Sequence, residues 1–350
     1  MKPRAVSAVV LSSALPALAA AAWVGSSRRF RHRLLTADPL PPDLPGVRGS
    51  VGFSFEGVSG TAGFRLSRDG DTSRAPVVLI HGWGGSSDLT WRTVLPLLDR
   101  PFLAVDLVGH GESRWPGPCS VEASAAGVLA AVSAAGFSQP PILVGHSMGG
   151  AVALAALRQA HPGQFSRLVM SATAVWWQTA RFVLSSAAAP WLLGPDSPYF
   201  LHPLVEELET SPDRAHELVW RYKARPSRRV LAESVAALRR FDARPWVAAV
   251  VPDDVTWVVP TSDRVVDPEL QVASAQRCGA RIFEVPAAQH SFFLDDPMPL
   301  LDVLDDAGVT RSDLGASAVG GPVPLAAPDA PAGSLLERLW PRLSSAFSPA

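Results

Sequence analysis

Cysteine is scarce in this chain of 350 residues, which contains only Cys119 and Cys278. Two cysteines are too few for a disulfide framework or for a cysteine-based metal site, although a single bridge between them stays possible. We interpret them as two unpaired, small apolar residues. No group of His, Asp and Glu has the spacing of metal ligands, so the sequence predicts no metal and no other cofactor.

An excess of charge of either sign is also absent. The 31 Lys and Arg nearly balance the 32 Asp and Glu, and the formal net charge is -1. Such a chain has no overall field that would attract nucleic acid, so we expect no nucleic-acid partner. What the sequence does contain is apolar: 47% of its residues are hydrophobic and 18% are charged, which is typical of a globular protein.

Residues 1–35 form a hydrophobic segment with basic flanks. The uncharged stretch 5–27 follows Lys2 and Arg4 and is long enough to cross a bilayer, which takes about 20 residues. An arginine-rich flank, 28–33, comes directly after it. The segment predicts a membrane-associated protein with an N-terminal anchor. Two alternatives are a signal peptide on a secreted protein and a soluble helix on a cytoplasmic one.

A proline-rich linker, 36–48, leads to a domain that we place at 49–308. The domain is expected to open with a hairpin, 51–56 and 62–67, around a turn at 57–60. Short apolar runs then alternate with helical stretches such as 121–135 and 148–160, which predicts a mostly parallel sheet flanked by helices. The expected strands are 77–80, 103–107, 142–144, 168–170, 255–259 and 282–285.

The alternation of strands and helices stops between about 175 and 250. This stretch has helical patterns, many aromatic residues and no convincing strand, so we interpret it as a helical cap inserted between two strands. The final segment, 309–350, is a tail rich in Ala, Pro and Gly, and a tail of that composition is expected to be disordered. Oligomeric state leaves no mark in the sequence.

The strongest chemical signal is the run Gly145-His146-Ser147-Met148-Gly149. A short apolar strand precedes this G-x-S-x-G pattern and a helix follows it, which is the context of a nucleophile elbow. The sharp turn would present the hydroxyl of Ser147 above the sheet, at a helix N-terminus that favours negative charge. Ser147 is therefore our candidate nucleophile.

A second glycine-rich turn, His81-Gly82-Trp83-Gly84-Gly85, also follows an apolar strand. Acyl transfer passes through a tetrahedral oxyanion that needs two backbone N–H donors. One donor is expected from Met148, next to the nucleophile, and the other from Trp83 in this turn.

A serine nucleophile needs a general base, and the chain has eight histidines. His290 follows the last expected strand, at the sheet edge where such folds build their sites, and is our candidate base. Asp263 follows strand 255–259 and is our candidate for the acid that orients His290. Asp267 is the competitor, although it precedes Pro268 and is also suited to capping a helix that begins there.

With these motifs in this order, the chain resembles the α/β-hydrolase family over about residues 50–305. The turn Asp106–Ser113 belongs to the resemblance, together with the motifs around His81 and Ser147, Asp263 and His290. The chain looks like the serine esterase and lipase branch with a helical cap. The family's acid usually follows Gly-x-x, whereas Pro260 stands in the place of that glycine here.

We therefore expect a serine hydrolase that cleaves a carboxylic ester-like bond through an acyl-enzyme. The aromatic cap favours a small apolar substrate. Alternatives that share the triad are carbon–carbon bond hydrolysis, thioester or amide cleavage, acyl transfer and perhydrolysis, because the fold alone does not fix the reaction. A non-catalytic binding protein on this fold is the alternative from another class.

Overall fold

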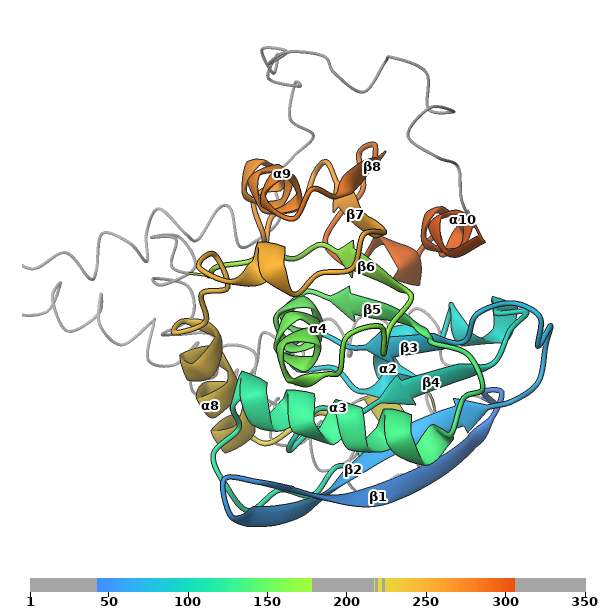
Figure 1. Cartoon of the computed structure of the whole chain (residues 1–350), viewed down its shortest axis with the longest axis vertical. Coiled ribbons are helices and arrows are strands. Elements are labelled where there is room, and N and C mark those ends of the chain that lie inside the picture. The colour runs from blue at the N-terminus through green and yellow to red at the C-terminus, as the bar shows by residue number, and fades with distance from the viewer. Residues whose placement is uncertain (1–42, 178–216, 218–219, 222–223, 306–350) are drawn as a thin grey trace, which may run out of the picture. The chain divides into compact units, whose positions relative to one another are not determined.

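The computed structural model describes residues 43–177, 217, 220–221 and 224–305. Within them an eight-stranded sheet has the order β1-β2-β4-β3-β5-β6-β7-β8. β1 and β2 form an antiparallel hairpin at one edge, β2 pairs antiparallel with β4, and the remaining neighbours all run parallel (Figure 1). The expected architecture, a mostly parallel sheet with helices, is confirmed. The strands are β1 Val47–Phe55, β2 Val58–Ser67, β3 Val77–Ile80, β4 Phe102–Val105, β5 Ile142–His146, β6 Arg167–Ser171, β7 Val255–Pro260 and β8 Arg281–Val285.

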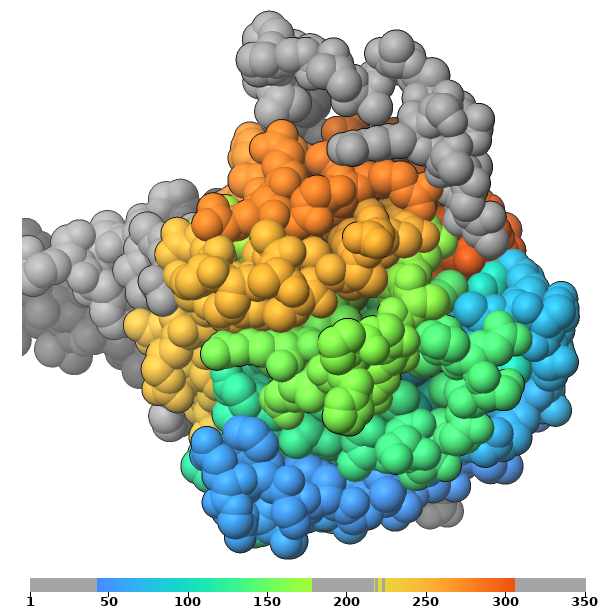
Figure 2. Space-filling view, in the orientation of Figure 1, coloured from blue at the N-terminus to red at the C-terminus, as the bar shows by residue number. Residues whose placement is uncertain are grey.

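The central strands are apolar on both faces because helices cover both sides of the sheet. In β3, Val78 and Ile80 join one hydrophobic cluster, with α3 (Val121–Ala135), α4 (Met148–Gln159) and α9 (Pro268–Arg277). Val77 and Leu79 join the cluster on the opposite face, with α2 (Ser87–Trp91) and α10 (Met298–Asp305). Residues of α3 and α4, green in Figure 2, lie between the blue hairpin and the orange C-terminal elements.

The first strand of the hairpin and its turn lie at different residues from those that the sequence predicted. β1 starts at Val47, so the last two residues of the expected linker, 36–48, already belong to a strand. The connection is the pair Glu56 and Gly57, with φ of 48° and 77°, rather than the expected turn at 57–60. Two consecutive positive φ angles give the tight turn that matches strand twist, which is why β2 can start at Val58.

Only part of the expected cap lies among the described residues. It includes α8 (Arg228–Leu238), a short 3-10 helix at Val247–Ala249 and an isolated bridge between Trp176 and Asp242. Further 3-10 turns lie at Leu95–Leu97 and Phe292–Leu294. The cap as a unit stays a prediction.

The expected anchor in 1–35 and the tail 309–350 lie outside the described residues, as does most of the linker. Among the residues that are described, none of the helices combines the length and apolar character needed to span a bilayer. Cys119 and Cys278 are both free and buried, as expected, and burial raises the pKa of each thiol to about 12.

Candidate active site

Ser147 lies between the end of β5 and the start of α4. Its φ of 54° and ψ of -123° form a strained conformation that a residue with a side chain rarely adopts. Three hydrogen bonds hold it: its N–H donates to Ser171 O at 2.9 Å, and its carbonyl accepts from Thr173 Oγ1 at 2.6 Å and from Gly150 N at 2.9 Å. The elbow inferred from the motif is thus present as backbone geometry.

The glycines of the elbow are needed because the chain is crowded there. A Cβ at Gly149 would lie 2.3 Å from Ile80 O, and one at Gly145 would lie 2.7 Å from Gly149 O. Real Cβ atoms do not approach backbone atoms so closely, and close packing leaves no room for the chain to shift. Gly149 therefore lets α4 begin directly against the end of β3, and Gly145 lets the end of β5 lie against the first turn of α4.

The turn that carries Trp83 passes beside the nucleophile. A Cβ at Gly82 would lie 3.0 Å from the Cβ of Ser147, which places the backbone of the turn next to that residue. The Trp83 indole N–H donates to Leu231 O in α8 at 2.9 Å. Met148, the other expected oxyanion donor, is the first residue of α4 and is buried. Both N–H groups therefore belong to backbone that adjoins Ser147.

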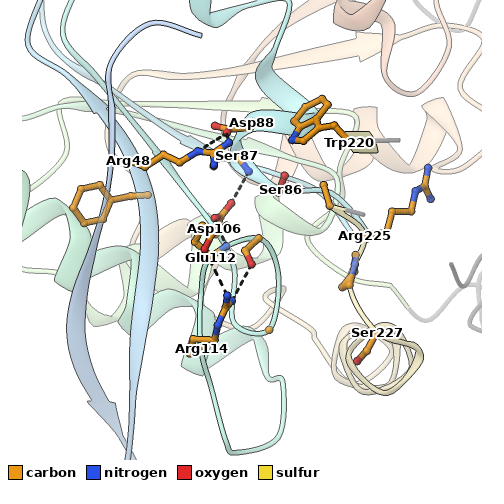
Figure 3. Close-up of a pocket in the computed structure, with 15 residues that line it drawn as sticks. Arg48, Ser86, Ser87, Asp88, Asp106, Glu112, Arg114, Trp220, Arg225 and Ser227 are labelled. Carbon is orange, nitrogen blue, oxygen red and sulfur yellow. Dashed lines mark hydrogen bonds and ion pairs between the residues drawn. The ribbon is translucent and has the colours of Figure 1, made fainter. Parts of the chain in front are cut away.

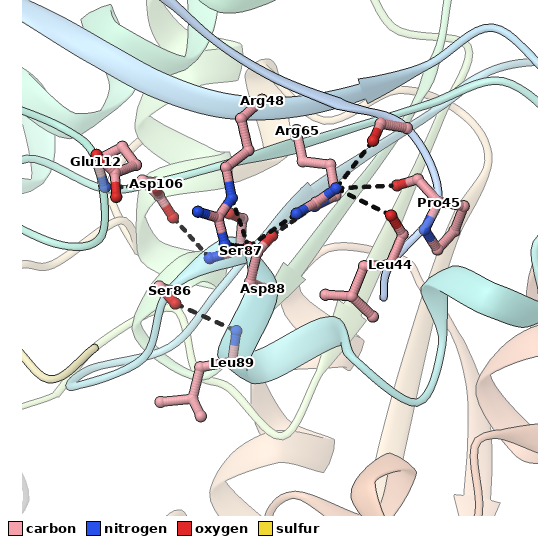
Figure 4. A network of polar contacts seen from close by, with 11 residues as sticks. Leu44, Pro45, Arg48, Arg65, Ser86, Ser87, Asp88, Leu89, Asp106 and Glu112 are labelled. Atoms are coloured by element: carbon pink, nitrogen blue, oxygen red, sulfur yellow. Dashed lines mark hydrogen bonds and ion pairs between the residues drawn. The ribbon is translucent and has the colours of Figure 1, made fainter. Parts of the chain in front are cut away.

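Polar contacts hold this turn at its far end, where it enters α2 (Figure 4). The Ser86 hydroxyl accepts from Leu89 N and caps α2, while Ser87 N donates to Asp106 Oδ1 at 2.7 Å. Asp88 accepts from Arg65 Nε at 2.6 Å and from Arg48 Nη2 at 2.6 Å. The contacts link the turn to β1, β2 and the end of β4.

Two buried carboxyl groups in this network have opposite pKa shifts. Burial raises the pKa of Asp106 to about 6, against the lowering effect of its hydrogen bonds from Glu112 N and Ser87. Burial acts in the same direction on Asp88, but the hydrogen bonds and charges of Arg65 and Arg48 outweigh it and lower the Asp88 pKa. The carboxylate whose ionised form is favoured is thus the one with arginine partners.

On the opposite side of the site, His290 and Asp263 form a direct pair. His290 Nδ1 lies 2.8 Å from Asp263 Oδ2, and the Asp263 side chain is fully buried. Because a carboxylate can only accept, Nδ1 carries the proton and Nε2 presents its lone pair. Asp263 N donates to Pro260 O, so the proline in the place of the family's glycine still closes the turn.

Asp267 has a different place from Asp263. It is the N-cap residue of α9, where its backbone carbonyl accepts from Leu270 N at 3.0 Å and from Gln271 N at 3.1 Å. No side-chain capping hydrogen bond accompanies it. The position at the helix start agrees with the sequence, while the contact with His290 belongs to Asp263.

The imidazole of His290 packs against the residue that precedes Ser147. The imidazole of His290 lies 4.9 Å, centroid to centroid, from that of His146, the residue before Ser147. Within the described part of the chain, no hydrogen bond joins the Ser147 hydroxyl to His290. Such bonds are often long in enzymes without substrate and shorten when substrate binds.

The other buried histidines near the site are neutral. Burial lowers the pKa of His81 to about 3 and that of His110 to about 4, and it holds the His146 pKa well below its usual value. His81 Nε2 accepts from Leu107 N at 3.0 Å, so its proton is on Nδ1, which faces Gly82 O at 2.7 Å. A histidine with both nitrogens engaged is not suited to act as a general base.

A hollow of about 440 Å³ lies at the end of β4, away from the three candidate triad residues. Figure 3 shows its polar wall, formed by Arg48, Asp88, Asp106, Glu112 and Arg114. Arg48 pairs with Asp88, and Arg114 with Glu112. These two ion pairs balance part of the charge on the wall, which also includes Asp106 and Arg225.

Sequence reasoning missed two contributors to the site. Gln271 donates to Asp263 Oδ2 at 2.9 Å from within α9, and Asp88 joins Arg65 and Arg48 across 23 and 40 residues of sequence. The sequence did contain a signal for Gln271. It lies on the same buried face of the helix as Ser274, Ala275 and Cys278, and a long polar side chain on a buried face needs a hydrogen-bond partner.

Known proteins support the assignment of the fold. A model described as the alpha/beta hydrolase family matches residues 77–303. The chain is 36% identical over 110 residues to lipase LipV of Mycobacterium tuberculosis, which covers 31% of this chain and 41% of that protein. It is 35% identical over 118 residues to a pimeloyl-acyl-carrier-protein methyl ester esterase of Neisseria meningitidis, covering 33% of this chain and 43% of that protein.

Among solved structures, a thermophilic esterase from Thermogutta terrifontis has a TM-score of 0.59 at 20% identity, covering 73% of this chain and 97% of that one. This likeness shows the fold. A mostly parallel sheet with a strained serine elbow and a buried Asp–His pair defines the class of α/β hydrolases. Because the family model matches well over half of the chain, the protein belongs to the α/β-hydrolase family. Its alignments with the curated relatives span less than half of their length.

Proposed function

We propose that this protein is a serine hydrolase that cleaves carboxylic ester bonds through an acyl-enzyme intermediate. The observation that carries the proposal is the strained Ser147 elbow beside an imidazole whose Nδ1 is bonded to a buried carboxylate. Relatives named as a lipase and as a methyl ester esterase support ester cleavage over other reactions of this fold.

In the proposed reaction, Ser147 Oγ attacks the ester carbonyl carbon while His290 Nε2 takes the hydroxyl proton. The N–H groups of Trp83 and Met148 donate to the oxyanion of the tetrahedral intermediate. His290 then gives its proton to the leaving alkoxide, which departs as an alcohol and leaves an acyl group on Ser147. A water molecule, deprotonated by His290, then attacks the acyl carbon, and His290 returns that proton to Ser147 Oγ as the bond to the acyl group breaks and the carboxylic acid is released.

Asp263 keeps the His290 proton on Nδ1 and stabilises the imidazolium that forms in each step. No metal or cofactor enters this scheme. The described residues contain no group of His, Cys, Asp and Glu arranged to hold a metal ion.

Hydrolysis of p-nitrophenyl esters from acetate to decanoate tests the proposal, with Ser147→Ala as the control. We expect turnover by the wild-type protein, loss of turnover in the variant and labelling by a fluorophosphonate probe only where Ser147 is present. A parallel panel of thioesters, amides and diketones ranks the alternatives. Turnover of one of these in preference to every ester would reject ester cleavage, and equal labelling of the Ser147→Ala variant would reject the nucleophile.

A further inference from the structure

Gln271 is a buried polar side chain that the reaction scheme above does not use. It lies on α9, which packs against β7 and β8 (Figure 1), and the residue is fully buried. Its Nε2 donates two hydrogen bonds, to Asp263 Oδ2 and to Val266 O, both at 2.9 Å. Because both partners are acceptors, the amide nitrogen must face them, and the orientation of the amide is fixed.

The Asp263 carboxylate receives four hydrogen bonds, divided between its two oxygens. Oδ1 accepts from Val265 N at 2.7 Å and from Val266 N at 3.0 Å. Oδ2 accepts from His290 Nδ1 at 2.8 Å and from Gln271 Nε2 at 2.9 Å. Among the described residues, Gln271 is therefore the one side-chain donor besides His290 on this carboxylate, and it binds the oxygen that faces the imidazole.

The oxygen end of the Gln271 amide is expected to lower the stability of the fold. Within the part of the chain that the structure describes, Gln271 Oε1 is buried and accepts no hydrogen bond. A buried acceptor without a partner lowers stability, and an apolar side chain of the same length would avoid this. The benefit of the amide at this position must then come from its donor end.

We propose that Gln271 is a positioning residue that holds the Asp263 carboxylate in the orientation His290 requires. The proposal rests on the serine-hydrolase function proposed above. Without the amide, the two backbone donors still hold Oδ1, but Oδ2 is fixed by His290 alone, and the carboxylate and imidazole can turn together. Misplacement of a catalytic group by a fraction of its contact distance is enough to slow the reaction.

The amide also affects how strongly Asp263 holds the His290 proton. An N–H dipole on Oδ2 offsets part of its negative charge, so removing the dipole strengthens the attraction between Oδ2 and the imidazolium. Of the described titratable side chains, Asp263 from the β7–α9 turn and His146 from the end of β5 contact His290, and His146 is neutral. Loss of the Gln271 donor is therefore expected to make His290 harder to deprotonate.

The test compares Gln271→Met with Ser274→Ala in the intact protein. Ser274 is a matched control because it is also fully buried on α9, donates to Leu270 O and accepts from Val175 N, without touching the triad. For Gln271→Met we expect kcat for a p-nitrophenyl ester to fall by about tenfold to a hundredfold at unchanged KM. We also expect the acidic limb of the kcat/KM profile to move to higher pH. Ser274→Ala is expected to change stability without either effect.

A proton NMR measurement keeps this test separate from the proposed function. The His290 Nδ1 proton, assigned by its loss in His290→Gln, reports the bond to Asp263 whether or not esters are substrates, and we expect it to shift and broaden in Gln271→Met. An unchanged resonance together with wild-type kcat and an unmoved acidic limb would overturn the proposal. A wild-type protein that shows the resonance but hydrolyses no ester would instead overturn only the proposed function.

Discussion

Two halves of the candidate site are held together by different physics. The nucleophile half, comprising His81–Gly85, Asp106–Ser113 and Gly145–Gly150, depends on backbone strain and on glycines that admit close contact. The acid–base half, comprising Pro260–Gln271 and Val285–Phe293, depends on side-chain hydrogen bonds that converge on one carboxylate. The first half should fail through loss of fold and the second through loss of rate.

The difference follows from what each half must fix. A nucleophile and two oxyanion donors are positioned by main-chain atoms, and main-chain positions are set by sterics. An acid and a base are positioned by side chains that can rotate, so each needs partners that fix its orientation. Substitutions test this comparison. A change in the nucleophile half that lowered only the rate, or a change in the acid–base half that lowered only the stability, would contradict it.

The largest effect is expected from Asp263→Asn. The substituted amide cannot stabilise the imidazolium and favours the wrong His290 tautomer, so kcat should fall by about 10³-fold to 10⁴-fold. Folding should change far less, because Oδ1 still has backbone donors on it. Ester turnover and urea unfolding measure the two properties. Asp267→Asn is the control. Its kcat should stay within about threefold of the wild-type value, because the carboxylate bonded to His290 is that of Asp263. A larger fall in kcat for Asp267→Asn than for Asp263→Asn would assign the acid to Asp267.

Gly149→Ala changes the nucleophile half and is expected to lower the stability of the fold. A Cβ there would lie 2.3 Å from Ile80 O and 2.6 Å from His81 O, so the end of β3 or the start of α4 must move. We expect a loss of about 3 kcal/mol or more in the free energy of unfolding. Gly52→Ala is the matched control, since a Cβ at Gly52 meets nothing within 4 Å. Urea denaturation of both variants measures this difference. Equal stabilities would show that a Cβ at position 149 can be accommodated against the end of β3.

These examples also show what the sequence could reveal. The elbow and the Trp83 turn are contiguous motifs, so their position between strand and helix was readable from local pattern alone. The pairing of Asp263 with His290 joins residues 27 apart and was inferred because each residue follows an expected strand. Gln271 and Asp88 escaped because their roles depend on tertiary contacts: one faces the triad only after α9 packs on β7, and the other meets Arg48 only after β1 joins the sheet.

The expected bounds of β3 to β8 differ from the observed bounds by at most two residues, whereas both strands of the hairpin begin four residues earlier than expected. β3 and α3 have the expected bounds, because apolar runs and flanking turn residues mark both ends. β1 extends to Val47 although many of its residues are exposed, since antiparallel pairing with β2 supplies its hydrogen bonds. An edge strand that faces solvent carries little apolar pattern to detect.

Acid should weaken the nucleophile half first, because His81, His110 and His146 all belong to it. A histidine takes up a proton below pH 6.5 when unfolded, but His81 and His110 do so only near pH 3 and 4 when folded. Their stability contribution is thus present above pH 6.5 and lost as the pH falls through that window. At pH 5 the loss is about 2 kcal/mol for each of the two.

Proton uptake by Asp106 opposes this trend. Its folded pKa of about 6 lies above the ordinary 3.8, so the folded state gains stability as the pH falls from 6 towards 4. Urea unfolding at pH 7.5 and pH 5 measures the balance, which we expect to favour unfolding at pH 5. His110→Gln should reduce the difference between the two pH values by about 2 kcal/mol. The exposed His161 provides the control, and an equal change in His161→Gln would contradict the assignment to burial.

The smallest effect is expected from Arg48→Ala, and it tests how the Trp83 turn is anchored. Arg48 and Arg65 bind the same carboxylate, Asp88, but their side chains are 43% and 8% exposed. Water screens the Arg48 pair, so its removal should cost less than about 1 kcal/mol. Arg65→Ala should cost about 3 kcal/mol, because it leaves Asp88 with a half-exposed partner and frees the carbonyls of Leu44 and Gly46. If urea unfolding gave equal losses for the two variants, burial would not be what makes the Asp88 contact stabilising, and the turn would have to be held mainly by Ser87 and Asp106.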